Sequence, residues 1–166
     1  MNTEMGEYVV GACLQLKFGC DFISYNVRPP ESGLPGLAEI DVVGLNFIQH
    51  TAYLCEVSTH LDGLHYGTGY EESAKKVREK YVRLQTYAKN NLQDFPAIKY
   101  MFWSPRIPKG RLISLLAEIE KNGLKLIIND DYKQSVEYLR SKARKTTRDI
   151  GNPFFRALQI LEHLHS

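Results

Sequence analysis

The sequence has no apolar stretch approaching the ~18 residues that a helix needs to cross a bilayer, so it predicts no membrane partner. Its first residues, Met-Asn-Thr-Glu-Met-Gly-Glu, lack the basic start and apolar centre of a secretion signal. Cysteine is scarce and odd in number: Cys13, Cys20 and Cys55, with no CxxC pair. We expect buried free thiols in a reducing compartment, with zinc ligation as the alternative. These absences predict a cytoplasmic, intracellular protein.

Basic residues are nearly missing from the first half of the chain. Residues 1–74 hold two Lys or Arg against ten Asp or Glu, whereas residues 75–148 hold eighteen against seven. An acidic half suits a metal ion and a basic half suits a polyanion such as nucleic acid. The alternative is that the lysines and arginines coat solvent-facing helices.

Length and composition are those of an ordinary globular protein. With 166 residues, 43% hydrophobic and 24% charged, the chain predicts a single domain over 1–166. We expect its core at about 6–130 and C-terminal helices at about 132–165. There is no internal repeat and no low-complexity segment. A glycine-rich stretch at 61–70 lacks the GxxxxGK[ST] spacing, which excludes a P-loop.

The most informative stretch runs from Gly36 to His60 and predicts two strands joined by a polar turn. The first strand is expected at about 38–47 and the second at about 51–59. Because strand side chains alternate with period two, Asp41 and Glu56 project to the same side of this pair. Two adjacent carboxylates repel each other unless a cation lies between them. Magnesium suits such a place, since it takes one or two carboxylates and completes its shell with water and phosphate oxygens.

The motif Glu-Ile-Asp41, followed after fourteen residues by Glu56-Val-Ser, resembles the PD-(D/E)XK, or restriction-endonuclease-like, nuclease superfamily. The segment from Gly6 to Arg28 looks like the opening helix and first strand of the branch that includes Holliday-junction resolvases. The resemblance covers about 6–104. One position departs from it: Ser58 stands where the family usually has lysine.

The resemblance implies roles for several residues. Asp41 and Glu56 would bind Mg²⁺ or Mn²⁺ together with the backbone carbonyl of Val57. Glu7, in the opening helix, would be the accessory acidic residue that orients metal-bound water; the alternative is a surface glutamate near a helix N-terminus.

The missing lysine needs a substitute if the protein cuts DNA. The clearest helix is expected at 71–91, with an apolar stripe of Ser73, Val77, Tyr81, Leu84 and Ala88. Lys76 and Lys80 lie one turn apart on its flank, and we predict that Lys76, or else Lys80, replaces the lysine of the motif. His60 shares the face of Glu56 if its strand continues past Thr59. Either lysine alone is also typical of a solvated helix.

The predicted order of elements is helix, three strands, helix, strand, helix, strand, helix, helix. Further strands are expected at 97–103 and 124–128, and further helices at 112–122, 132–145 and 154–165. Residues 29–36 are expected to form a loop at the mouth of the site. Three antiparallel strands extended by parallel crossovers give a mixed sheet of about five strands, in the three-layer α/β/α, restriction-endonuclease-like class.

We therefore expect a metal-dependent DNA endonuclease that hydrolyses phosphodiester bonds. The alternative is a catalytically inactive nuclease-like domain that binds nucleic acid or a protein partner; a chance match in an unrelated α/β protein is the third possibility. Basic residues of the second half, including Arg140, Lys142, Arg144 and Lys145, would contact phosphates with a salt-dependent affinity. The apolar C-terminal helix is a candidate interface for a homodimer.

Overall fold

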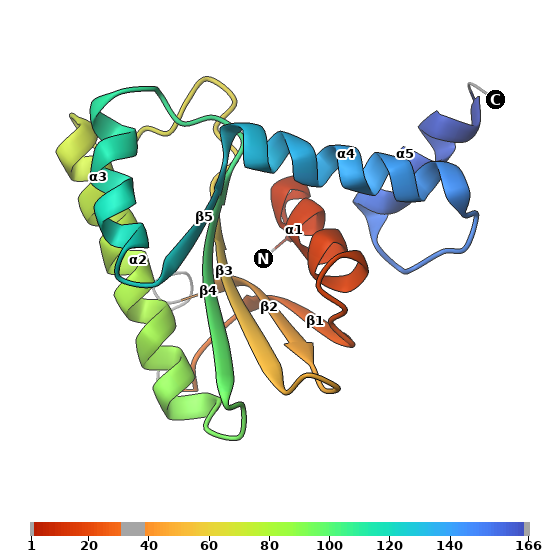
Figure 1. Cartoon of the computed structure of the whole chain (residues 1–166), viewed down its shortest axis with the longest axis horizontal. Coiled ribbons are helices and arrows are strands. Elements are labelled where there is room, and N and C mark those ends of the chain that lie inside the picture. The colour runs from red at the N-terminus through yellow and green to blue at the C-terminus, as the bar shows by residue number, and fades with distance from the viewer. Residues whose placement is uncertain (1, 31–38, 165–166) are drawn as a thin grey trace.

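The structure is a computed structural model and describes residues 2–30 and 39–164. Within these residues the chain forms a mixed five-stranded sheet and five helices (Figure 1). The strands are β1 (Phe22–Val27), β2 (Ile40–Asn46), β3 (Thr51–Val57), β4 (Ala97–Ser104) and β5 (Leu124–Ile128). The helices are α1 (Met5–Leu16), α2 (Tyr70–Asn91), α3 (Arg111–Glu120), α4 (Asn129–Lys145) and α5 (Pro153–Leu164).

The sheet follows the chain, in the order β1-β2-β3-β4-β5. β1, β2 and β3 pair antiparallel, whereas β4 and β5 are parallel to β3 and follow the crossover helices α2 and α3. The β2–β3 turn is closed by Asn46, whose side chain accepts a hydrogen bond from the Gln49 amide at 2.8 Å. The predicted α/β class and the mixed sheet of five strands are confirmed.

One face of the sheet is covered by α1, with α4 and α5 beside it (Figure 1). Its core joins Val9 and Cys13 of α1 to Cys55 and Trp103 of the sheet and to Phe155 of α5. All three cysteines are buried and free. The first and last helices are tied directly, because the Asn152 side chain donates a hydrogen bond to the Tyr8 carbonyl at 2.9 Å.

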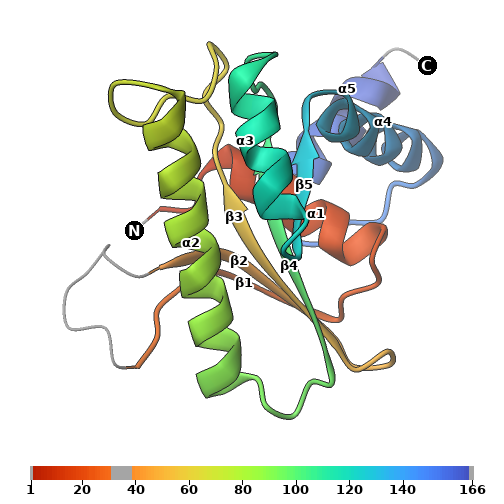
Figure 2. The same cartoon turned by 60° about the vertical axis from the view of Figure 1, so that its left-hand side comes forward.

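The opposite face is covered by α2 and α3, which lie in front of the sheet in Figure 2. The predicted apolar stripe of α2 is buried throughout: Ser73, Val77, Tyr81, Leu84 and Ala88. A fully buried side chain such as Leu84 contributes about 1.5–3 kcal/mol, more than the ~0–1 kcal/mol of a surface ion pair. Burial of the stripe, rather than the many charges around it, therefore determines which side of α2 faces the sheet.

Some boundaries differ from those predicted. β3 ends at Val57 rather than Thr59, although the Ser58 amide still donates to the Trp103 carbonyl at 2.9 Å. α4 begins at Asn129, three residues before the expected start. The expected loop at 29–36 and the expected strand start at 38 fall mostly outside the described residues. No helix in the described part of the chain is long and apolar enough to cross a membrane.

α1 approaches the sheet closely at Gly11. A β-carbon placed there would lie 2.0 Å from the hydroxyl oxygen of Tyr25 and 2.7 Å from its ring carbon Cζ. Tyr25 is itself fixed by the Asn152 side chain, which donates to its hydroxyl at 3.3 Å, and by an edge contact with Tyr8. The absence of a side chain at position 11 is therefore a condition for packing α1 on β1.

We expect Gly11→Ala to destabilise the protein by about 1–2 kcal/mol. Alanine gains up to ~1 kcal/mol in helix propensity, but displacing the Tyr25 ring costs more, since overpacking typically costs ~1–3 kcal/mol. Urea unfolding followed by circular dichroism measures the difference. Gly69→Ala is the matched control, because nothing lies within 4 Å of a β-carbon there. Equal stability of the two variants would contradict this account of α1 packing.

Candidate functional site

Asp41 and Glu56 come from neighbouring positions of the antiparallel strands β2 and β3. Val42 pairs with Cys55, so the residue before Val42 and the residue after Cys55 flank the same end of the ladder. Val43 lies two residues after Asp41, and Leu54 lies two residues before Glu56, so each pair shares a face of the sheet. Val43 and Leu54 pack beneath α2, which places Asp41 and Glu56 on the α2 face as well. The negative charge of Asp41 contributes to raising the pKa of Glu56, as adjacent carboxylates do.

The Glu56 carboxylate is buried, with 1% of its side chain exposed, and two cations from α2 contact it. Lys80 Nζ lies 2.7 Å from Oε2, and Arg83 Nη2 lies 3.1 Å from Oε1. Burial raises the pKa of Glu56, and the charges of Lys80 and Arg83 only partly oppose this effect. Lys80 and Arg83 therefore favour the ionised form of Glu56, against the effect of burial.

Asp41 is only half-buried and is oriented by the backbone of β3. Its Oδ2 accepts a hydrogen bond from the Val57 amide at 2.7 Å. This bond fixes the carboxylate at the end of the strand, next to the peptide that carries the Val57 carbonyl. The role of that carbonyl as a metal ligand stays a prediction.

Of the two candidate lysines, the structure brings only Lys80 to the carboxylates. Burial opposes its charge, but the neighbouring acidic groups, with Glu56 the strongest, together raise the pKa of Lys80. Lys76, one turn earlier, is half-exposed and pairs with Glu79 of its own helix at 3.5 Å. Lys80, rather than Lys76, is therefore the better placed of the two to replace the lysine of the motif. The apolar stripe that faces the sheet directs Lys80 toward β3.

Glu7, the predicted accessory acid, approaches the site from α1. Its Oε2 accepts hydrogen bonds from the Asn26 side chain at 3.2 Å and from the Glu4 amide at 3.1 Å. Burial raises the pKa of Glu7, and the negative charge of Asp41 adds to the increase. Glu7 therefore caps α1 and also lies close enough to Asp41 for the charge of Asp41 to affect its pKa.

The glycine-rich segment after β3 lies over the same end of the sheet. Tyr66 is held to the start of α2 by Ser73, whose hydroxyl donates to the Tyr66 carbonyl and accepts from its amide. Lys80 Nζ lies 6.0 Å from the centre of the Tyr66 ring. His60 is exposed and contacts Tyr66 edge-on. We expected it on the face of Glu56 only if β3 continued past Thr59, but β3 ends at Val57.

Ser58 continues the face of Glu56 and is buried. Its hydroxyl has no hydrogen-bond partner among the described residues. Since the Lys80 ammonium already contacts Glu56 on this face, a second ammonium from position 58 would meet like charge. The small hydroxyl at position 58 is compatible with the lysine on α2.

The donor chemistry suits a hard divalent cation. Asp41 and Glu56 supply two carboxylates beside the two cationic groups of Lys80 and Arg83, and of these residues Glu7 lies near Asp41 alone. Within residues 2–30 and 39–164, no group of three or more His, Cys, Asp or Glu side chains is arranged to hold a metal ion. The predicted ligand set has only two side chains, completed by a backbone oxygen and water.

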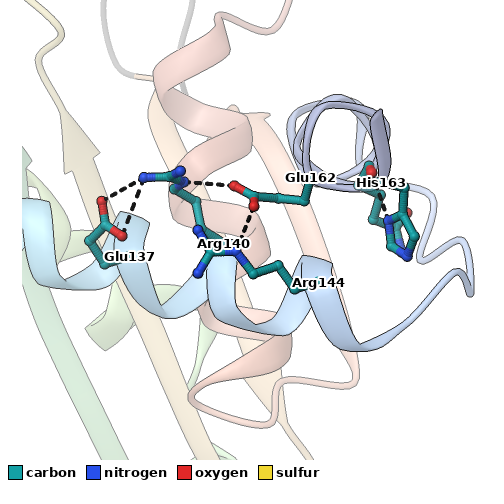
Figure 3. A network of polar contacts seen from close by, with 6 residues as sticks. Glu137, Arg140, Arg144, Glu162 and His163 are labelled. Carbon is teal, nitrogen blue, oxygen red and sulfur yellow. Dashed lines mark hydrogen bonds and ion pairs between the residues drawn. The ribbon is translucent and has the colours of Figure 1, made fainter. Parts of the chain in front are cut away.

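The basic run at the end of α4 divides into two kinds of residue, of which Figure 3 shows the arginines paired with glutamate. Arg140 and Arg144 both contact the Glu162 carboxylate of α5, at 2.8 and 2.5 Å, and Arg140 also contacts Glu137 at 3.1 Å. The two arginines lower the pKa of Glu162. Lys142, in contrast, lies over the ring of Tyr138. The charges of Arg140 and Arg144 are thus partly used within the protein.

Two residues of the site were not predicted. Arg83 lies three residues after Lys80, and helical spacing alone places it on the same flank of α2. Asn26 has a positive φ of 51° and directs its side chain to Glu7, which the pattern of β1 does not indicate. The signal for Arg83 was therefore present in the sequence, whereas that for Asn26 was not.

Comparison with known proteins adds no assignment: no family model and no curated protein matches the chain.

We expect Lys80→Gln to destabilise the protein near neutral pH by about 2 kcal/mol, because it leaves a buried carboxylate with one partner fewer. The pKa of Glu56 in the folded protein is raised above its value in the unfolded chain. The protein is therefore most stable, as far as Glu56 is concerned, below the unfolded pKa, and it loses this stability as the pH rises through the folded pKa. Removing Lys80 raises the folded pKa further. The deficit relative to wild type should therefore shrink as pH falls toward ~4.5.

Urea unfolding between pH 4.5 and 8 measures this dependence. Lys76→Gln is the matched control on the same helix, since its pair with Glu79 is exposed and should contribute less than ~1 kcal/mol at any of these pH values. A Lys80→Gln deficit that is constant with pH would mean that Glu56 does not titrate in this range.

Proposed function

We propose that the protein is a metal-dependent nuclease, a DNA endonuclease that hydrolyses phosphodiester bonds. The observation that carries the proposal is the 2.7 Å contact of Lys80 Nζ with the Glu56 carboxylate, on the face that also holds Asp41. The sequence motif lacks its lysine, and the fold supplies an ammonium to the same carboxylate from the neighbouring helix. A carboxylate pair with a lysine is the set that the resemblance implies, and an ammonium there would stabilise charge on the phosphate oxygens.

Asp41 and Glu56, with the Val57 carbonyl, would hold Mg²⁺ or Mn²⁺. When bound, the ion supplies Lewis acidity: it lowers the pKa of a coordinated water and neutralises charge on the phosphodiester. The second carboxylate, Asp41, supports this, because its negative charge acts on Glu56 and it makes no ion pair among the described residues. Asp41 is held in place by the Val57 amide, so its orientation is fixed before any ion binds.

Lys80 would stabilise the negative charge that develops on the phosphate oxygens. Its long side chain is 23% exposed and lies near the ring of Tyr66, so the ammonium can serve both Glu56 and a ligand above it. Arg83 contacts the other oxygen of Glu56 and keeps that carboxylate ionised when Lys80 turns toward substrate. Glu7 would accept a hydrogen bond from a water beside Asp41, in keeping with its raised pKa.

The arrangement of elements supports the same proposal at a coarser level. Helices lie on both faces of a mixed sheet, and the two carboxylates lie where its antiparallel and parallel parts meet. A restriction-endonuclease-like fold has this α/β/α layering. A homodimer is the assembly that we propose for cutting two strands, and α5 offers exposed apolar side chains for it: Ile160, Leu161 and Leu164.

One observation favours the alternative, a catalytically inactive domain that binds nucleic acid or a protein partner. Both oxygens of Glu56 are already in ion pairs, and one oxygen of Asp41 accepts the Val57 amide. A metal ion must then compete with Lys80 and Arg83 for Glu56. In a binding domain the same cluster would only join α2 to the sheet.

We expect Lys80→Ala to reduce DNA cleavage at least ~100-fold with little change in DNA binding, because an ammonium at the phosphate acts mainly on the transition state. Cleavage of plasmid, branched and single-stranded DNA is measured with Mg²⁺ or Mn²⁺. Lys76→Ala, on the same helix but paired with Glu79, is the matched control and should retain full activity.

The same assay separates the two functions. Asp41→Asn should abolish cleavage, since it removes the negative charge that a metal ion needs. Cleavage that survives in Asp41→Asn would refute the mechanism, and full activity in Lys80→Ala would refute the role of that lysine. DNA binding without cleavage in the wild-type protein, across all substrates and both metals, would favour the binding domain.

A further inference from the structure

A cavity of about 500 Å³ lies far along α1 from the candidate site, where the ends of α1 and α4 meet the segment before α5. Its lining combines basic, polar and apolar side chains: Gln15, Leu16, Lys142, Thr146, Arg148, Asp149, Ile150 and Phe155. We propose that this cavity binds the sugar–phosphate backbone of a nucleic-acid strand, with a phosphate between Lys142 and Arg148. The identity of the ligand as nucleic acid rests on the proposed function.

The first argument is unbalanced positive charge. Lys17 and Lys142 come from different helices, yet their ammonium groups lie 5.8 and 5.4 Å from the centre of the same Tyr138 ring. Among the described residues, no carboxylate lies within ion-pair distance of these lysines, of Lys145 or of Arg148. Like charges gathered in this way repel each other, and an anion in the adjoining cavity relieves that repulsion.

Neighbouring arginines on α4 differ from Lys142, because they have carboxylate partners within the protein. Arg140 and Arg144, on the same helix, are both paired with Glu162, so the chain neutralises one side of α4 (Figure 3). On the cavity side the one lining carboxylate, Asp149, accepts the Gly151 amide at 2.8 Å and keeps its negative charge, so the lining cations Lys142 and Arg148 exceed it by one positive charge. The basic residues that can bind an external anion are therefore those at the cavity, and not all the basic residues at the end of α4.

The second argument is a preformed wall. The buried side chain of Gln159 donates to the carbonyls of Thr146 and Arg148, at 2.8 and 2.9 Å. The Thr146 hydroxyl in turn accepts the Arg148 amide at 3.1 Å. On the other side, Tyr138 joins α4 to α1 by donating its hydroxyl hydrogen to the Leu16 carbonyl at 2.9 Å. A wall held by these bonds needs little ordering on binding, which favours affinity.

The third argument is the match to a repeating, partly apolar polyanion. Leu16 and Ile150 provide apolar surface next to the two cations, as a sugar beside its phosphate requires. From Glu7 to Leu16, α1 rises ~14 Å, at ~1.5 Å per residue. Phosphates along one strand are ~3.4 Å apart along the duplex axis. If the duplex axis runs parallel to α1, a strand held at the cavity reaches the level of Glu7 after about four phosphates.

The test measures binding of fluorescent duplex and single-stranded DNA in EDTA, so that no cleavage occurs. We expect Lys142→Gln with Arg148→Gln to weaken binding at least ~10-fold at ~100 mM salt and, for duplex DNA, to reduce the slope of log K against log salt by about 0.9, since one phosphate contact is lost. Lys121→Gln with Lys125→Gln removes the same charge from α3 and β5, where each lysine pairs with a glutamate. This control should weaken binding less than twofold.

An equal loss in the two double variants would refute the cavity as a site, because net charge alone would explain it. So would wild-type protein that binds no DNA at low salt but binds vesicles of anionic phospholipid. A second measurement uses the unaltered protein: on adding duplex DNA, amide NMR signals of residues 146–151 should shift. Signals that stay in place would also refute the proposal.

Failure here is distinct from failure of the proposed function. If metal-dependent cleavage is lost in Asp41→Asn while the cavity variants bind normally, the nuclease stands and the cavity has no part in it.

Discussion

The buried ion cluster at Glu56 is the constraint on which the site depends. A carboxylate with 1% exposure on a central strand is tolerated only because Lys80 and Arg83 reach it from α2. The cluster therefore fixes the position of α2 along β3, in addition to the apolar stripe that fixes its rotation. Glu56, Lys80 and Arg83 therefore act as one unit, because loss of either cation leaves the buried carboxylate of Glu56 with a single partner.

The fold was largely predictable because its signals are local. Period-two alternation fixed the faces of β2 and β3, and the apolar stripe fixed the buried side of α2. Parallel strands after crossover helices follow from general rules of connection. The ends of elements were less accurate: β3 stops at Val57, two residues before the predicted end.

The site was predictable only in part. Asp41 and Glu56 could be assigned to one face from spacing alone. The choice between Lys76 and Lys80 could not, because it depends on the angle between α2 and the sheet. Likewise the engagement of Arg140 and Arg144 by Glu162 depends on how α5 folds back, which no pattern in α4 encodes. The contact of these two arginines with phosphates stays a prediction.

The contact between α1 and α5 has a consequence for biosynthesis. Asn152 holds the carbonyl of Tyr8, which precedes it by 144 residues, and Phe155 completes the core beneath α1. As the chain emerges from the ribosome, β1, β2 and β3 are available early, but their α1-side face is not fully covered until α5 has been made. Nascent chains must therefore expose apolar surface until α5 has been made, and this is the interval in which a chaperone would have access to them.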